Sequence, residues 1–195
     1  GLSYVESSHI VVLTTDHSVQ FWDSDIPRCI TIHQSPNESR VTAICSYGQD
    51  SVAVAIFHNG ITAITLFEVL RKVDGGKTTL ANKTDDILSV VINPVARGEI
   101  DGICLKLASV SCESEKSVLY AVIDEHILRL KVRGKDISIG NVQRSMNGRS
   151  IMAIASSTLA LDFNNSNTGD ASQFRNGILA AGETLGPIFA IVHHG

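Results

Sequence analysis

Hydrophobic residues recur along this sequence in four pairs of short runs, and two to four polar residues separate the two runs of each pair. The runs are rich in β-branched and small apolar residues, and the second run of a pair alternates apolar with polar positions. Such alternation is typical of β-strands, and a short polar break between two strands is typical of a hairpin turn. The sequence therefore predicts four β-hairpins, over residues 10–22, 52–66, 118–132 and 178–192.

The first three pairs share one internal spacing, which indicates a repeat. The second run of each pair starts nine positions after the first, and in the fourth pair the separation is ten. The expected turns contain residues that tolerate a positive φ or bond to their own backbone, and Asn-Gly is a strong hairpin signal. These turns are Asp16-His17-Ser18, His58-Asn59-Gly60 and Asp124-Glu125-His126.

Further strand-like runs flank the hairpins. Runs over residues 40–46, 86–93 and 150–156 precede the second, third and fourth hairpins, and runs over residues 29–33, 78–82 and 136–140 follow the first three. Each unit is thus expected to contain one strand, a hairpin and a closing strand. Four antiparallel strands repeated at intervals of about 40 residues or more are typical of β-propeller blades.

The predicted fold is all-β, a propeller-like array of about four antiparallel four-stranded blades in a single region over residues 1–195. Two insertions are expected in this array, near residues 94–116 and 164–176. Because most propellers have more blades than four, we expect the array to be part of a larger ring that further chain or a partner closes. A β-sandwich or a partial barrel is the alternative, since many short strands with turn signals fit those folds too.

Residues 16–23, DHSVQFWD, resemble the end of a WD40 repeat. In that repeat an aspartate in a tight turn precedes an alternating strand that ends in Trp-Asp. Asp16 and the Trp22-Asp23 pair match this pattern, and Asp124 stands at the corresponding turn of the third unit. Trp-Asp occurs once, with Ile64-Thr65 and Leu130-Lys131 at the expected equivalent positions, so the resemblance is to a divergent WD40-like propeller. Trp22 is expected to be buried, because it closes an alternating strand.

The resemblance implies a non-catalytic scaffold for protein–protein interaction within a multi-subunit intracellular complex, such as nuclear pore, ribosome-assembly or trafficking machinery. Its partners would be other protein subunits, in the cytoplasm or the nucleus. Interaction residues are expected in or beside the polar loop over residues 164–176, where aromatic and charged side chains are available. The candidates are Phe163, Asp170, Phe174 and Arg175.

Composition narrows the function without defining it. The 195 residues are 44% hydrophobic and 18% charged, with a net charge of -4 and no basic cluster, so direct nucleic-acid binding is not expected. No apolar run is long enough to cross a bilayer, so no membrane insertion is expected. The cysteines form no metal-binding pair, and we expect them to be buried fillers in a reducing compartment. They are Cys29, Cys45, Cys104 and Cys112.

Catalytic and metal-binding motifs are not recognisable in the sequence, so we expect neither enzymatic activity nor a cofactor. His17, His58 and His126 stand at equivalent turns, but turns of successive blades lie too far apart to share a metal ion. The alternative is an enzymatic propeller, a hydrolase whose active site lies at the central channel and is contributed partly by missing blades. A channel lined by several charges would favour that alternative.

Overall fold

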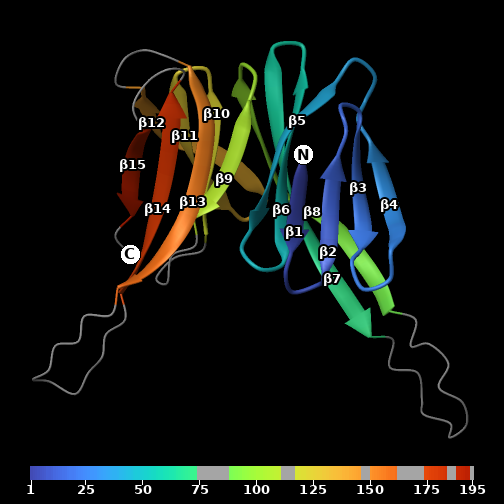
Figure 1. Cartoon of the computed structure of the whole chain (residues 1–195). Coiled ribbons are helices and arrows are strands. Elements are labelled where there is room, and N and C mark those ends of the chain that lie inside the picture. Colours follow the sequence, from blue (N-terminus) through green and yellow to red (C-terminus); the bar gives the residue numbers. More distant parts are fainter. Residues whose placement is uncertain (74–87, 111–116, 146–149, 162–173, 184–187, 194–195) are drawn as a thin grey trace, which may run out of the picture.

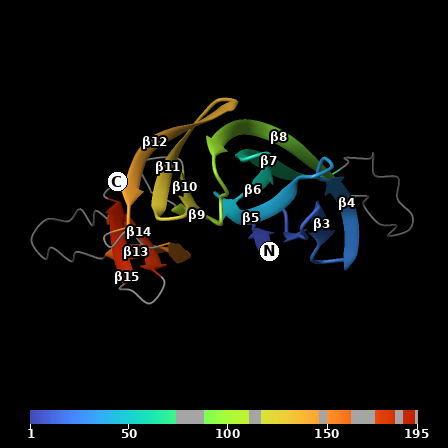
Figure 2. The same ribbon diagram turned by 90° about the horizontal axis from the view of Figure 1, so that it is seen from above.

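The computed structural model describes residues 1–73, 88–110, 117–145, 150–161, 174–183 and 188–193 (Figure 1). These residues form strands, turns and bends, with no helix among them. The strands form three sheets, as Figures 1 and 2 show. Their bounds are β1 Leu2–Val5, β2 Ile10–Thr14, β3 Ser18–Asp23, β4 Arg28–Gln34, β5 Arg40–Tyr47, β6 Ser51–His58, β7 Ile61–Val73, β8 Leu88–Asp101, β9 Lys106–Val110, β10 Val118–Ile123, β11 His126–Arg133, β12 Asp136–Arg144, β13 Ile151–Leu161, β14 Phe174–Glu183 and β15 Ile188–His193.

The first sheet is an antiparallel meander in the order β1-β2-β3-β4. The second contains eight strands in the order β5-β6-β7-β8-β12-β11-β10-β9, and it curves until its two edge strands lie side by side. At that seam the Ser109 hydroxyl on β9 donates to the Ser46 carbonyl on β5 at 2.6 Å. The eight strands therefore form a nearly closed, barrel-like sheet. The third sheet has the order β13-β14-β15.

The eight-stranded sheet consists of two meanders, β5–β8 and β9–β12, that meet at one position. β8 and β12 are parallel there, with Arg97 opposite Asp136, and the Arg97 amide donates to the Lys135 carbonyl at 2.9 Å. Every other neighbouring pair in the sheet is antiparallel and comes from consecutive strands. The described chain thus contains three four-stranded meanders, followed by β13–β15.

The three meanders share one pairing register. In each, a bulge separates two residues of the third strand where that strand pairs with the fourth. The third-strand residue after the bulge pairs with a residue of the second strand. That second-strand residue pairs in turn with a residue of the first strand, so the three residues form a row across the sheet. These rows are Trp22–Val11–Tyr4, Phe67–Val52–Ser46 and Leu130–Leu119–Ser109. Bulges at the same place in three meanders indicate that the meanders are structurally equivalent units.

Apolar cores fill the spaces between successive units. Phe21 and Val12 of β1–β4 pack with Val52, Val54 and Phe67 of β5–β8. A second core joins β5–β8 to β9–β12, and a third joins β9–β12 to β13–β15 through Ile151 and Ala181. Each unit therefore has a front face toward the next unit and a back face toward the preceding one. In Figure 2 the units follow one another along an arc, with the first strands β1, β5, β9 and β13 next to one another in order.

The four predicted hairpins are confirmed as β2–β3, β6–β7, β10–β11 and β14–β15. Asn59, Gly60 and Asp124 have positive φ values, as their places in tight turns require. The strands expected over residues 29–33, 40–46, 136–140 and 150–156 are also present, as β4, β5, β12 and β13. The strand expected over residues 78–82 lies outside the described residues.

Two expectations about residues 86–116 were wrong. The run expected over residues 86–93 does not open the third unit; its described part, residues 88–93, belongs to β8, the closing strand of the second unit, which continues through Asp101. The supposed insertion near residues 94–116 contains the rest of β8 and then β9, which opens the third unit. The fourth unit's expected insertion, residues 164–176, lies outside the described residues except for Phe174–Asn176 at the start of β14.

The repeat was also misaligned by the sequence spacing in the second unit. The residue pair equivalent to Trp22-Asp23 is Phe67-Glu68, not Ile64-Thr65, although Leu130-Lys131 in the third unit is confirmed. The reason is that the β6–β7 hairpin extends further beyond the shared row, to the pair His58 and Ile61, than the β2–β3 hairpin does. The equal nine-residue spacing in the sequence therefore did not reveal that the two hairpins differ in length.

Gly98 lies where β8 and β12 meet, and we expect Gly98→Ala to destabilise the protein. A Cβ atom there would stand 2.1 Å from the Ile137 carbonyl oxygen, so the two strands would have to separate. Overpacking of this kind costs about 1–3 kcal/mol. Urea unfolding measures the loss. Asn93→Ala, at an exposed position of β8, is the control, and an equal loss in both variants would contradict this placement of Gly98.

Candidate functional site

A groove of about 310 Å³ lies at the boundary between the first two units. The loop between β4 and β5 contributes Pro36 and Ser39 to one wall, and β6, β7 and β8 contribute the rest. The strand residues are on the back face of β5–β8, as their pairing registers require. The groove lining is Pro36, Ser39, Ile56, His58, Asn59, Ile61, Ala63, Thr65, Arg97 and Glu99.

The β2–β3 turn, which contains Asp16 and His17, holds the wall of this groove in place. The Ser35 amide donates to the His17 carbonyl and the Val41 amide donates to the Asp16 carbonyl, both at 2.8 Å. Nδ1 of His17 lies 3.2 Å from the Ser39 carbonyl oxygen, and the Ser39 hydroxyl donates to the Pro36 carbonyl. The loop from β4 to β5 is therefore fixed to the turn at both of its ends.

The groove combines an apolar floor with a charged rim. Ile56 and Ala63 are half-buried, and Ile61 is 41% exposed although it is a large apolar residue. On the rim, Nη2 of Arg97 lies 3.2 Å from Oε1 of Glu99, and both side chains are largely exposed. Such a surface can accept an apolar side chain from a ligand while the ion pair orients polar groups around it.

A second hollow, of about 370 Å³, has a different character. It is lined by Val118 of β10 and Ser117 just before it, by residues of β11, and by Tyr47 at the end of β5. Arg129, Lys131 and Arg133 alternate along β11, so they lie on one face of that strand. Burial raises the pKa of the Tyr47 phenol, which therefore stays neutral at physiological pH. The basic side chains favour acidic groups here, in contrast to the apolar floor of the first groove.

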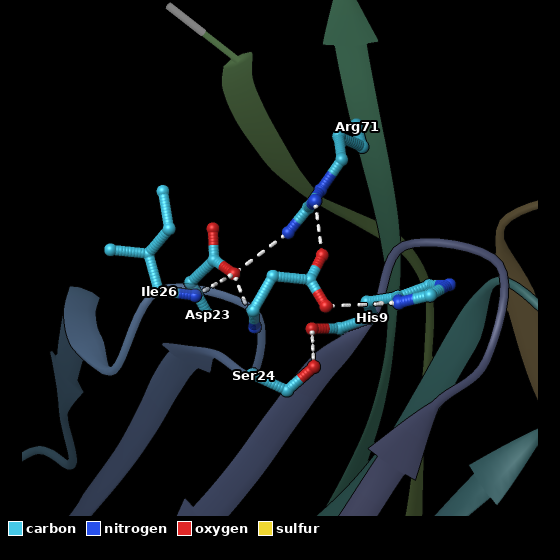
Figure 3. A network of polar contacts seen from close by, with 6 residues as sticks. His9, Asp23, Ser24, Ile26 and Arg71 are labelled. Carbon is cyan, nitrogen blue, oxygen red and sulfur yellow. Dashed lines mark hydrogen bonds and ion pairs between the residues drawn. The ribbon is translucent and has the colours of Figure 1, made fainter. Parts of the chain in front are cut away.

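Asp23 is the centre of a polar network that joins the first two units at another place (Figure 3). Its Oδ1 accepts hydrogen bonds from the amides of Asp25, at 2.9 Å, and Ile26, at 3.2 Å, which fixes the β3–β4 turn. Arg71 comes from β7 of the next unit, with Nη2 at 2.9 Å from Asp23 Oδ1 and Nη1 at 2.7 Å from Asp25 Oδ2. Nδ1 of His9 lies 3.2 Å from the other oxygen of Asp25.

The Asp23 carboxylate is charged inside this network. Its side chain is 2% exposed and that of Arg71 is 16% exposed. Burial by itself raises the pKa of Asp23, but the amide hydrogen bonds and the Arg71 charge outweigh burial, so that the pKa lies below its ordinary value of 3.8. A buried, paired and hydrogen-bonded carboxylate of this kind braces two units against each other.

The structure separates the four predicted motif residues. Asp16 lies in the exposed β2–β3 turn, with Oδ2 at 3.4 Å from Arg40 Nη2. Asp124, in the β10–β11 turn, accepts a hydrogen bond from the Ile151 amide through its carbonyl oxygen at 2.8 Å. Trp22 is half-buried, and its Nε1 donates to Gln20 Oε1 at 3.2 Å, so the expectation that Trp22 is a core residue was wrong. Phe21, on the opposite face of β3, is fully buried instead.

The predicted interaction residues are not brought to the groove by any described contact. Phe163 and Asp170 lie outside the described residues, and the side chains of Phe174 and Arg175 do too. The backbones of Phe174 and Arg175 pair with Leu161 and Ala160 of β13. Those four candidates remain predictions.

Sequence reasoning missed Arg71, Ile61, Arg97 and Glu99. Arg71 lies after the expected end of the second hairpin at residue 66, and Arg97 and Glu99 lie in the supposed insertion. One signal was available for the network: Asp-Ser-Asp after a strand is typical of an aspartate that bonds to the turn that follows it. The exposed Ile61 beside Asn59-Gly60 gave no signal, because isoleucine is common in strands.

Two of the cysteines are fillers of the core, as expected. Cys104 is fully buried and Cys45 packs against the same core. Burial raises the pKa of the Cys104 thiol to about 12, and burial together with the nearby Cys104 thiol raises the pKa of Cys45 as well. These thiols are therefore protonated and unreactive. Cys29 is half-buried, and Cys112 lies outside the described residues.

Within the described ranges, no three His, Cys, Asp or Glu side chains come close enough together to hold a metal ion. The same part of the chain has no helix long and apolar enough to cross a membrane. No family model and no curated protein matches the sequence.

Proposed function

We propose that this chain forms part of a β-propeller that diverges from the WD40-like family. Support comes from the three meanders, which share one register and place a bulge at the same position. Further support comes from β1, β5, β9 and β13, which lie next to one another in chain order. Propellers are built this way, with four-stranded blades whose first strands surround a centre.

The function we propose for this propeller is a non-catalytic platform that binds other protein subunits in an intracellular complex. The groove at the boundary of the first two units is the observation that carries this proposal. It offers an exposed isoleucine and an apolar floor beside an ion pair, on strands that the packed cores hold rigid. Apolar anchors surrounded by polar groups supply most of the binding energy in protein interfaces.

Loss of partner binding on Ile61→Asp would test the platform. We expect the immobilised wild-type chain to retain a stoichiometric set of proteins from a lysate of its own cells. An aspartate at position 61 would place a charge on the apolar floor and weaken that binding by roughly 10-fold or more. Quantitative mass spectrometry of the retained proteins measures the difference.

The matched control is Ile139→Asp. Ile139 is 48% exposed on β12, away from the groove, whereas Ile61 is 41% exposed within it. The control should retain the same proteins as the wild type, and far-UV circular dichroism should show that both variants are folded. Equal binding by all three chains, or no specific binding by the wild type, would argue against a platform that acts through this groove.

A further inference from the structure

The back face of the first unit is apolar, and no strand of the described residues covers it. Two rows of side chains cross its four strands, and no member of either row is charged or fully buried. We call this surface the Trp22 face. Its rows are Leu2–Leu13–Gln20–Ile32 and Tyr4–Val11–Trp22–Cys29.

In the next two units the equivalent positions on the first three strands are buried or half-buried, whereas those on the fourth strand are exposed. Phe67, which corresponds to Trp22, is 9% exposed and packs into the core against β1–β4. Leu130, which corresponds to Trp22 in the third unit, packs into the core against β5–β8. The Trp22 face thus continues a series of sheet-on-sheet interfaces, and its shape and chemistry suit another sheet of the same kind.

At the other end of the series, the front face of β13–β15 presents small residues. Ala153 and Ala155 on β13 are exposed and Ala180, paired with Ala155, is half-buried. Their neighbour Ile154 belongs to the opposite face and packs toward β9–β12. In the interface between β5–β8 and β9–β12, the small front-face residues Ala53 and Ala55 share a core with Leu119 and Leu130.

From this complementarity we propose that a second copy of the chain covers the Trp22 face with the front face of its own β13–β15 sheet. Small residues of one copy would pack against Tyr4, Leu13 and Trp22 of the other, as small residues pack against leucines inside the chain. A twofold axis would make the second contact identical to the first, so that two arcs close into one ring. The proposal rests on the propeller proposed above and adds its partner.

Trp22 is the only tryptophan of the chain, so its fluorescence reports directly on this face. In sedimentation equilibrium over a wide range of concentrations we expect the mass of a dimer. The emission of Trp22 should shift to shorter wavelength, and its quenching by acrylamide should fall, as dimer forms. A wild-type chain that stays monomeric, with Trp22 open to the quencher at every concentration, would overturn the proposal and leave the groove proposal untouched.

Charged substitutions on the Trp22 face and on the front face of β13–β15 distinguish the proposed dimer from other dimers. Leu13→Lys on the Trp22 face and Ala155→Glu on the front face of β13–β15 should each weaken the dimer by roughly 100-fold or more, because each buries an unpartnered charge. Leu13 corresponds to Val54, which is fully buried in the interface between the first two units. Ile139→Lys is the control, because Ile139 is a large apolar residue that is 48% exposed and lies on neither end face. A dimer that survives Ala155→Glu but not Leu13→Lys would mean that two Trp22 faces pair with each other, which contradicts the proposal.

Discussion

Replacing Phe21 with alanine is expected to lower the free energy of unfolding by about 3–5 kcal/mol, the usual cost of removing a phenyl ring from a packed core. Phe21 is completely buried between the first two units. Its ring lies 6.1 Å from that of Phe67 in an edge-to-face arrangement and 5.6 Å from the imidazole of His33. The change removes the centre of the core that joins β1–β4 to β5–β8.

The loss of stability in Phe21→Ala should be compared with that in Trp22→Ala. Although tryptophan is larger, Trp22 is half-buried on the opposite face of β3, so we expect a loss of about 1–2 kcal/mol in the monomer. Urea unfolding followed by far-UV circular dichroism measures both variants, in the Leu13→Lys background so that dimer formation does not contribute. A larger loss for Trp22→Ala than for Phe21→Ala would mean that β3 presents its faces the other way round.

Removing the Asp23 carboxylate should cost about as much as removing Phe21. Asp23→Ala would leave the Arg71 guanidinium, which is 16% exposed, without its closest buried partner and would release the amides of Asp25 and Ile26. Breaking a buried ion pair on one side costs about 3–5 kcal/mol. Asp16→Asn is the control, because Asp16 pairs with Arg40 at an exposed position, and its loss should be below about 1 kcal/mol.

The Asp23 carboxylate should also make the free energy of unfolding depend on pH in the acid range. The pKa of Asp23 is lower in the folded chain than its ordinary value of 3.8, so its contribution is complete above that value and is lost as pH falls through the folded-state pKa. Unfolding free energies measured from neutral pH down to pH values below about 4 should therefore decline less steeply in Asp23→Asn than in the wild type. Parallel declines in both proteins would show that Asp23 is not charged in the folded state.

Most of the strands could be predicted because the signals that define them are local. Alternation of apolar and polar residues located the hairpins, and Asn59-Gly60 placed one turn to the residue. β8 and β9 were misassigned for a physical reason. The largely apolar run over residues 88–92 fits either an opening or a closing strand, and only its pairing with β7 decides which it is.

The candidate site was less predictable than the fold. The groove depends on a loop after β4 meeting the back face of β6–β8, and the Asp23 network depends on Arg71, which is far from Asp23 in the sequence. Neither of these contacts between distant segments produces a periodic pattern in the sequence. The resemblance to the end of a WD40 repeat singled out Trp22 and Asp23, but the aromatic residue that is buried is Phe21 and not Trp22.

The sequence by itself determined that the chain is β-rich and that hairpins recur along it, because strand periodicity and turn chemistry depend on near neighbours. Only the tertiary structure decided which face of each strand is covered. A period of two shows that the two faces of a strand differ, whereas burial depends on which unit packs against each face. Phe21 and Trp22 are adjacent in the sequence, yet packing by β5–β8 buries one and leaves the other half-exposed.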